Sequence, residues 1–86
     1  MRILLVEDDA RLAAALQKGL REEGYTVDHA ATGGDGQLFA ASRHYDLIIL
    51  DRMLPEVSGD QLLARSRAEG LNTPILMLTA LDAVAD

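Results

Sequence analysis

Hydrophobic residues in this chain form short continuous runs separated by longer amphipathic segments. Residues 3–6, 47–50 and 75–78 are runs of four apolar residues that stop at polar side chains. The first run, which three acidic residues end, is typical of a strand buried on both faces, and the run at 47–50 is the most strand-like. Residues 25–30 alternate more strictly between polar and apolar, which predicts a strand nearer the edge of a sheet. The pattern therefore predicts four strands.

The segment between the first two strands has the periodicity of an amphipathic helix. Within residues 9–23, Leu12, Leu16 and Leu20 recur at every fourth position, and charged residues occupy other faces. Gly24 follows at the position where a glycine commonly ends a helix. A helix is expected over this range.

Two further helices are predicted between the later strands. One follows the break at residues 32–34 and extends to about residue 43. The other begins at Ser58, where Ser58 and Gln61 have the spacing of a capping box, and extends to about residue 69. Strands that alternate with helices predict an α/β fold whose parallel sheet is covered on both faces.

Composition narrows the classes of function. The chain has 86 residues, with 8 basic and 14 acidic side chains and a net charge of −6. The electrostatic field of a chain with this net charge does not favour binding to nucleic-acid phosphates or anionic lipids. The absence of cysteine excludes disulfides and thiolate chemistry, and no apolar run approaches the ~20 residues of a membrane helix. We expect one cytoplasmic domain over residues 1–86, with no membrane partner.

Acidic residues collect where the predicted strands end. Glu7 and Asp8 follow the first strand, Asp51 follows the third, and the hydroxyl of Thr79 follows the fourth. In a parallel sheet these side chains meet at one edge. Carboxylates ~4 Å apart repel by about 4 kcal/mol at an effective dielectric near 20. Such a cluster is stable when it is partly protonated or when it binds a cation. A ligand set that contains only oxygen favours Mg²⁺ over zinc.

Each acid also has a structural interpretation. Asp8 or Asp9 can cap the following helix, and a single aspartate after a strand is common in turns. The coincidence of three acids and a hydroxyl at three strand ends favours a site.

The sequence resembles the receiver domain of two-component response regulators, and is most similar to the OmpR/PhoB subfamily. The resemblance lies in Ile-Leu-Leu-Val-Glu-Asp-Asp at 3–9, Tyr-Asp-Leu-Ile-Ile-Leu-Asp-Arg-Met-Leu-Pro at 45–55, Gly59, and Pro-Ile-Leu-Met-Leu-Thr-Ala at 74–80. It implies a flavodoxin-like (CheY-like) doubly wound sheet with strand order 2-1-3-4. The fifth βα unit of the family has no counterpart, so this chain is expected to be a partial receiver domain.

The resemblance also implies roles for individual residues. Asp51 would be the phosphoacceptor. Asp8 would ligate Mg²⁺ directly, Glu7 mainly through water, and Met53 through its backbone carbonyl. Thr79 would hydrogen-bond the phosphoryl group. Pro55 and Gly59 would shape the loop and helix start, and Ala80 would leave space beside the phosphate.

The implied function is a phosphorylation-controlled signalling module. It would accept a phosphoryl group from a histidine kinase and regulate transcription through a DNA-binding domain absent from this chain. It would be no enzyme beyond self-catalysed phosphoryl transfer and autodephosphorylation. Two alternatives remain. One is a Mg²⁺-dependent aspartyl-phosphate phosphatase of the haloacid dehalogenase type, although that type usually has aspartate where this chain has Met53. The other is a fragment without signalling activity.

Several further residues complete the predictions. Arg52 follows the phosphoacceptor where the family usually has an apolar residue, which is expected to alter phosphorylation rate or local contacts. His29 and His44 have no partner at ligand spacing, so structural roles are expected, and Met53 and Met77 are expected to pack. Without a fifth strand, the outer edge of residues 75–78 is open. Such an edge can pair with another chain, so we expect a homodimer or aggregation.

Overall fold

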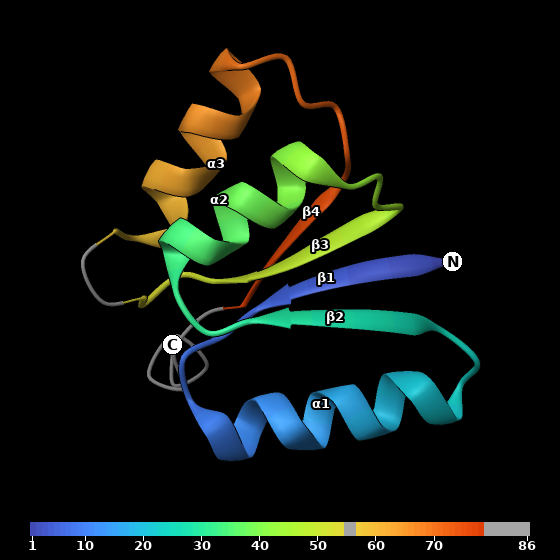
Figure 1. Ribbon diagram of the computed structural model, residues 1–86. Helices are drawn as coiled ribbons and strands as arrows, with labels where there is room; N and C mark the ends of the chain where they lie inside the picture. The colour runs from blue at the N-terminus through green and yellow to red at the C-terminus, as the bar shows by residue number, and fades with distance from the viewer. Residues whose placement is uncertain (55–56, 79–86) are drawn as a thin grey trace, which may run out of the picture.

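Four parallel strands run in the order β2-β1-β3-β4 through the computed structural model, which describes residues 1–54 and 57–78 (Figure 1). This order and the doubly wound α/β architecture confirm the predicted fold class. Along the chain the elements are β1 (Arg2–Val6), α1 (Ala10–Glu22), β2 (Thr26–Ala30), α2 (Gly33–Ser42), β3 (Leu47–Asp51), α3 (Gly59–Ala68) and β4 (Ile75–Leu78).

The sheet separates two hydrophobic layers. Helix α1 covers one face and α2 with α3 covers the other, as Figure 1 shows. Strand β1 is central, and each of residues 3–6 is at most 2% exposed. Leu4 and Val6 pack toward α2 and α3, and Ile3 and Leu5 pack toward α1. Burial of each such side chain contributes about 1.5–3 kcal/mol, so β1 is a fixed support for whatever follows it.

Helix ends confirm the predicted capping signals. Ser58 Oγ accepts from the Gln61 N–H, and Gln61 Oε1 accepts from the Ser58 N–H, which completes the capping box of α3. Gly24 follows α1 with a φ of +92°, a value that favours glycine. None of the helices in the described part of the chain is long and apolar enough to cross a membrane.

Helix α2 begins earlier than the sequence pattern predicts. Glycines at 33, 34 and 36 lie within its first turn, because Thr32 Oγ1 caps the helix by accepting from the Asp35 N–H at 3.1 Å. The third glycine has a packing reason, since a Cβ on Gly36 would lie 2.8 Å from Val6 Cγ2. Close approach to β1 therefore favours glycine in a segment that looks like a loop.

Strand β4 pairs with β3 along one side. Ile48 to Asp51 are in register with residues 75–78, and Leu76 is 53% exposed. Within residues 1–54 and 57–78, no strand pairs with the outer side of β4. The homodimer expected from this edge stays a prediction.

Candidate functional site

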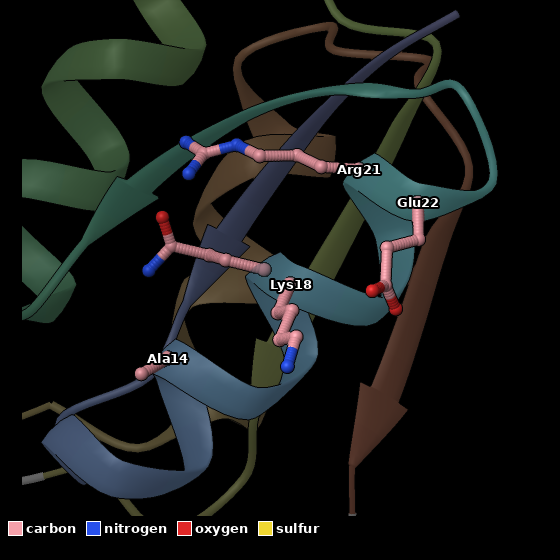
Figure 2. A pocket seen from close by; sticks show the side chains of 5 residues that line it. Ala14, Lys18, Arg21 and Glu22 are labelled. Atoms are coloured by element: carbon pink, nitrogen blue, oxygen red, sulfur yellow. The ribbon is translucent and has the colours of Figure 1, made fainter.

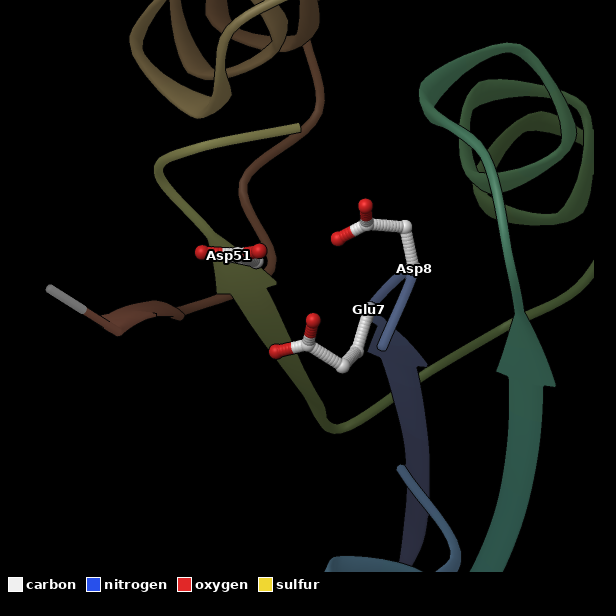
Figure 3. Close-up of side chains that lie close together, drawn as sticks. All are labelled: Glu7, Asp8 and Asp51. Carbon is white, nitrogen blue, oxygen red and sulfur yellow. The ribbon is translucent and has the colours of Figure 1, made fainter. Parts of the chain in front are cut away.

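Three carboxylates meet at the carboxyl edge of the two central strands. Strands β1 and β3 pair with Val6 opposite Leu50, so the next residue on each strand places Glu7 beside Asp51. Asp8 follows immediately. Oxygen atoms of Glu7, Asp8 and Asp51 all lie within 4.8 Å of one another. Figure 3 shows the side chains of Glu7 and Asp8, which follow β1, directed toward Asp51. We call these three residues the acidic cluster.

Glu7 is the most enclosed member of the acidic cluster. It is 2% exposed and is the one buried charged side chain among the described residues. Its Oε2 accepts from the Asp9 N–H at 3.0 Å. Its own N–H donates to the Ala30 carbonyl at 3.0 Å, and its carbonyl lies 2.8 Å from His29 Nε2. Both the backbone and the side chain of Glu7 are therefore held in place.

The surroundings of Glu7 favour its protonated form. Burial raises the pKa of the Glu7 carboxyl from 4.5 to about 7, although the hydrogen bond from Asp9 opposes this change. The charge of Asp51 is a smaller part of the same increase. A cation placed among the three carboxylates would relieve the same repulsion, so the cluster is suited to exchange a proton for a metal ion.

The raised pKa of Glu7 makes stability depend on pH. The folded chain binds this proton more tightly than the unfolded chain, so the free energy of unfolding should fall as pH rises from about 4.5 to about 7. Glu7→Gln removes the charge and keeps an oxygen acceptor for the Asp9 N–H. In urea denaturation without divalent cations, we expect this variant to exceed wild-type stability by on the order of 2 kcal/mol above pH 7.

The pH series contains its own comparison. Below about pH 4.5 wild-type Glu7 is protonated in both states, so the advantage of Glu7→Gln should disappear there. Glu22→Gln alters an exposed glutamate on α1 and should stay within about 0.5 kcal/mol of wild type. A Glu7→Gln difference that does not change with pH would contradict the assigned effect of burial.

Asp51 is held by the loop that follows β3. Its Oδ1 accepts from the Met53 N–H at 3.0 Å. The Arg52 carbonyl accepts from the Gly59 N–H at 2.9 Å, which joins the end of β3 to the start of α3. Arg52 Nε also lies 3.2 Å from Asp60 Oδ2, so the unusual arginine contacts the first turn of α3. The backbone after Asp51 is thus fixed from both sides.

The structure assigns different positions to the neighbouring acids of β1. Asp9 caps α1, where its Oδ1 accepts from the N–H groups of Arg11 and Leu12. The capping interpretation therefore applies to Asp9, while Asp8 belongs to the acidic cluster.

Other sequence predictions have mixed outcomes. The Met53 side chain is 66% exposed, so the prediction that it packs is wrong, because the hydrogen-bonded turn directs it outward. Met77 packs against the core as expected. A metal-binding role for the Met53 carbonyl stays a prediction. Thr79, Pro55 and Ala80 lie outside the described residues.

One residue at this edge has a contact that the sequence does not indicate. His29 contacts the Glu7 carbonyl across 22 positions of sequence. The available signal is its place at the end of β2, which becomes informative only when the register Leu5 opposite His29 is known.

A separate groove lies over the C-terminal half of α1. It encloses about 540 Å³ and is lined by Ala14, Gln17, Lys18, Arg21 and Glu22. Figure 2 shows Arg21 extending toward β2, where its Nη2 donates to the Val27 carbonyl at 3.0 Å. The groove includes no member of the acidic cluster, so it offers no comparable set of metal ligands.

The donor set of the acidic cluster fits a hard divalent cation. All three side chains offer carboxylate oxygens, with no sulfur or imidazole among the clustered ligand atoms. Mg²⁺ prefers such oxygen ligands and commonly keeps several waters. The exposed Asp8 and the half-buried Asp51 leave one side of the cluster accessible to solvent. The residues therefore suit Mg²⁺ together with an incoming ligand.

A doubly wound parallel sheet with an acidic cluster at its carboxyl edge defines a class of flavodoxin-like α/β domains. Within that class the family is also established. Residues 3–86 match the model of the response regulator receiver domain. The chain belongs to this family.

Individual relatives agree with this assignment. The chain is 46% identical over 84 residues to the probable transcriptional regulatory protein SilR of Salmonella typhimurium, covering 98% of this chain and 37% of SilR. The response regulator TrrA of Thermotoga maritima, solved in complex with Mg²⁺ and BeF, has a TM-score of 0.88 and 34% identity, covering 99% of this chain and 75% of TrrA.

A third comparison includes a partner. The complex of the histidine kinase ThkA with TrrA matches with a TM-score of 0.85 and 37% identity, covering 92% of this chain and 68% of the matched chain. The chain spans little more than a third of the length of SilR.

Proposed function

We propose that this domain is the phosphoacceptor of a two-component signalling pathway, with Asp51 as the residue that receives the phosphoryl group. The observation that carries the proposal is the acidic cluster, in which Asp51 lies within 4.8 Å of Glu7 and Asp8 at one edge of a receiver fold. Glu7 and Asp8 would hold Mg²⁺ together with Asp51, and the Met53 carbonyl would be a further ligand.

The proposed reaction uses an oxygen of Asp51 as the nucleophile. Oδ1 accepts from the Met53 N–H, so Oδ2 is assigned to attack phosphorus. A phosphorus–oxygen bond forms while the bond from phosphorus to the donor's histidine nitrogen breaks, and the nitrogen keeps that electron pair. Bound Mg²⁺ would neutralise negative charge on the phosphoryl oxygens. Thr79 is proposed to donate a hydrogen bond to the phosphoryl group.

The proposed partners follow from the relatives. TrrA forms a complex with a histidine kinase, which supports a histidine kinase as donor for this chain. SilR is named as a transcriptional regulatory protein, which supports control of transcription through a DNA-binding domain outside this chain. The domain itself would catalyse only its own phosphorylation and dephosphorylation. Consistent with this role, we place the protein in the cytoplasm.

Acetyl phosphate provides a test that needs no cognate kinase. The intact protein is incubated with acetyl phosphate in Mg²⁺ or in EDTA, and its mass is measured. We expect one phosphoryl group per chain in Mg²⁺ and none in EDTA, because the cluster needs a cation to accept a dianionic group. Mg²⁺ alone should also raise the melting temperature, since it binds the folded cluster.

Two results would contradict the proposal. One is equal phosphorylation in Mg²⁺ and EDTA. The other is a melting temperature that Mg²⁺ leaves unchanged, together with no phosphorylation under either condition.

A further inference from the structure

His29 reaches the acidic cluster from the edge strand of the sheet. It lies on β2 opposite Leu5 of β1, and its Nε2 is 2.8 Å from the Glu7 carbonyl oxygen. A carbonyl oxygen can only accept, so Nε2 carries the hydrogen and donates it. This is the tautomer that the contact requires at a half-buried ring.

The bond continues the pairing of β1 with β2 beyond the last residue of β1. Val6 is opposite Ala30, and the Glu7 N–H still donates to the Ala30 carbonyl. The Glu7 carbonyl has no strand residue to pair with at this point, and the His29 ring supplies the donor. An enclosed carbonyl without a donor is unfavourable, so the ring stabilises this backbone conformation.

The position of this carbonyl connects His29 to the carboxylates. It belongs to the peptide unit that joins Glu7 to Asp8, and a peptide unit is planar. Fixing the oxygen therefore fixes the direction in which the chain enters Asp8. The Glu7 carboxylate is held by a second hydrogen bond, because its Oε2 accepts from the N–H of Asp9, the residue after Asp8. One hydrogen bond from β2 thus helps to set the directions of two acids of the cluster.

We propose that His29 is a positioning residue for the acidic cluster: through the Glu7 carbonyl it orients Glu7 and Asp8 toward Asp51. The inference rests on the proposed function, since it assigns His29 to the same Mg²⁺ site. His29 is not a metal ligand in this proposal. Its effect passes through the backbone, so it should change cation affinity without changing the chemistry of Asp51.

Two substitutions at His29 distinguish the effect of losing the hydrogen-bond donor from the effect of losing the volume of the ring. His29→Leu removes the donor and keeps an apolar side chain, whereas His29→Gln keeps an N–H donor on a side chain of similar reach. We expect Mg²⁺ binding to the full chain, followed by amide NMR shifts, to weaken roughly 3- to 10-fold in His29→Leu. His29→Gln should stay within about twofold of wild type. His44→Leu, which removes an exposed histidine, should leave binding unchanged.

Phosphorylation kinetics give a second readout. In His29→Leu the Mg²⁺ concentration for half-maximal phosphorylation by acetyl phosphate should rise, and the rate at saturating Mg²⁺ should equal that of wild type. A purely structural role would instead lower the rate at every concentration of Mg²⁺. Wild-type affinity in a folded His29→Leu variant would overturn the proposal.

A measurement on the unmodified protein guards against a variant that fails to fold. In metal-free wild type, the ¹⁵N spectrum of His29 should show the hydrogen on Nε2. The opposite tautomer, with hydrogen on Nδ1, would overturn the proposal. Failure of the proposed function gives a different result, because wild type would then bind no Mg²⁺, and the assignment of His29 would fall with it.

Discussion

Asp51→Asn should reduce phosphorylation by acetyl phosphate to background while the domain stays folded. The asparagine amide is not a nucleophile, because its nitrogen lone pair is delocalised and its oxygen carries no full charge. The substitution keeps an oxygen that can accept from the Met53 N–H, so the turn after β3 should persist. It also removes one charge from three carboxylates within 4.8 Å, so stability without Mg²⁺ should be equal or higher.

The measurement is the intact mass after reaction in Mg²⁺, followed by peptide mapping. Asp35→Asn is a matched control, because Asp35 is an exposed aspartate in the first turn of α2 and lies outside the cluster. It should be phosphorylated as fast as wild type. If Asp51→Asn still acquired a phosphoryl group at the wild-type rate, the phosphoacceptor would have to be another residue.

Gly59→Ala should destabilise the domain by about 3 kcal/mol or more. A Cβ at this position would lie 2.5 Å from the Asp51 carbonyl oxygen and 2.8 Å from the Arg52 Cα. Both are backbone atoms at the end of β3 and directly after it, so neither can move without displacing the Asp51 backbone. The same Cβ would lie 2.9 Å from Met77 Sδ on β4. Urea denaturation in EDTA measures the loss without a contribution from metal binding.

Gly19→Ala is the control for the general effect of alanine in a helix. Gly19 lies within α1 and has no atom within 4 Å of an added Cβ. Alanine there should stabilise the domain by about 0.5–1 kcal/mol, since glycine is a poor helix former. If Gly59→Ala lowers the free energy of unfolding while Gly19→Ala raises it, the loss at Gly59 is due to close packing. A Gly59→Ala variant as stable as wild type would show that α3 can move away from β3.

The architecture could be predicted because local pattern and tertiary structure agree. Apolar runs of four residues mark β1, β3 and β4, and the Ser58 capping box marks the start of α3. The acidic cluster could also be predicted, since a parallel sheet brings the ends of its strands to one edge. Asp8 and Asp9 could not be distinguished, because either residue has the chemistry of a helix cap and only the backbone path selects Asp9.

What could not be predicted depends on register and close packing. The need for glycine at position 36 of α2 depends on its distance from Val6, which no local propensity contains. The contact of His29 with Glu7 needs the exact alignment of β2 on β1. The outward position of the Met53 side chain follows from a turn closed by Asp51, whereas an apolar residue in the sequence suggests packing.

The pairing of β1 directly with β3 has a thermodynamic consequence. The spacing of adjacent strands, about 4.8 Å, sets how far apart the backbones of Glu7 and Asp51 can lie, whatever the lengths of the loops. Low-energy local openings begin at termini, loops and sheet edges, and they leave this central pair intact. The acidic cluster should therefore persist until the domain unfolds as a whole. Cation affinity and global stability are then linked, so a remote substitution that strengthens the core also preserves the site.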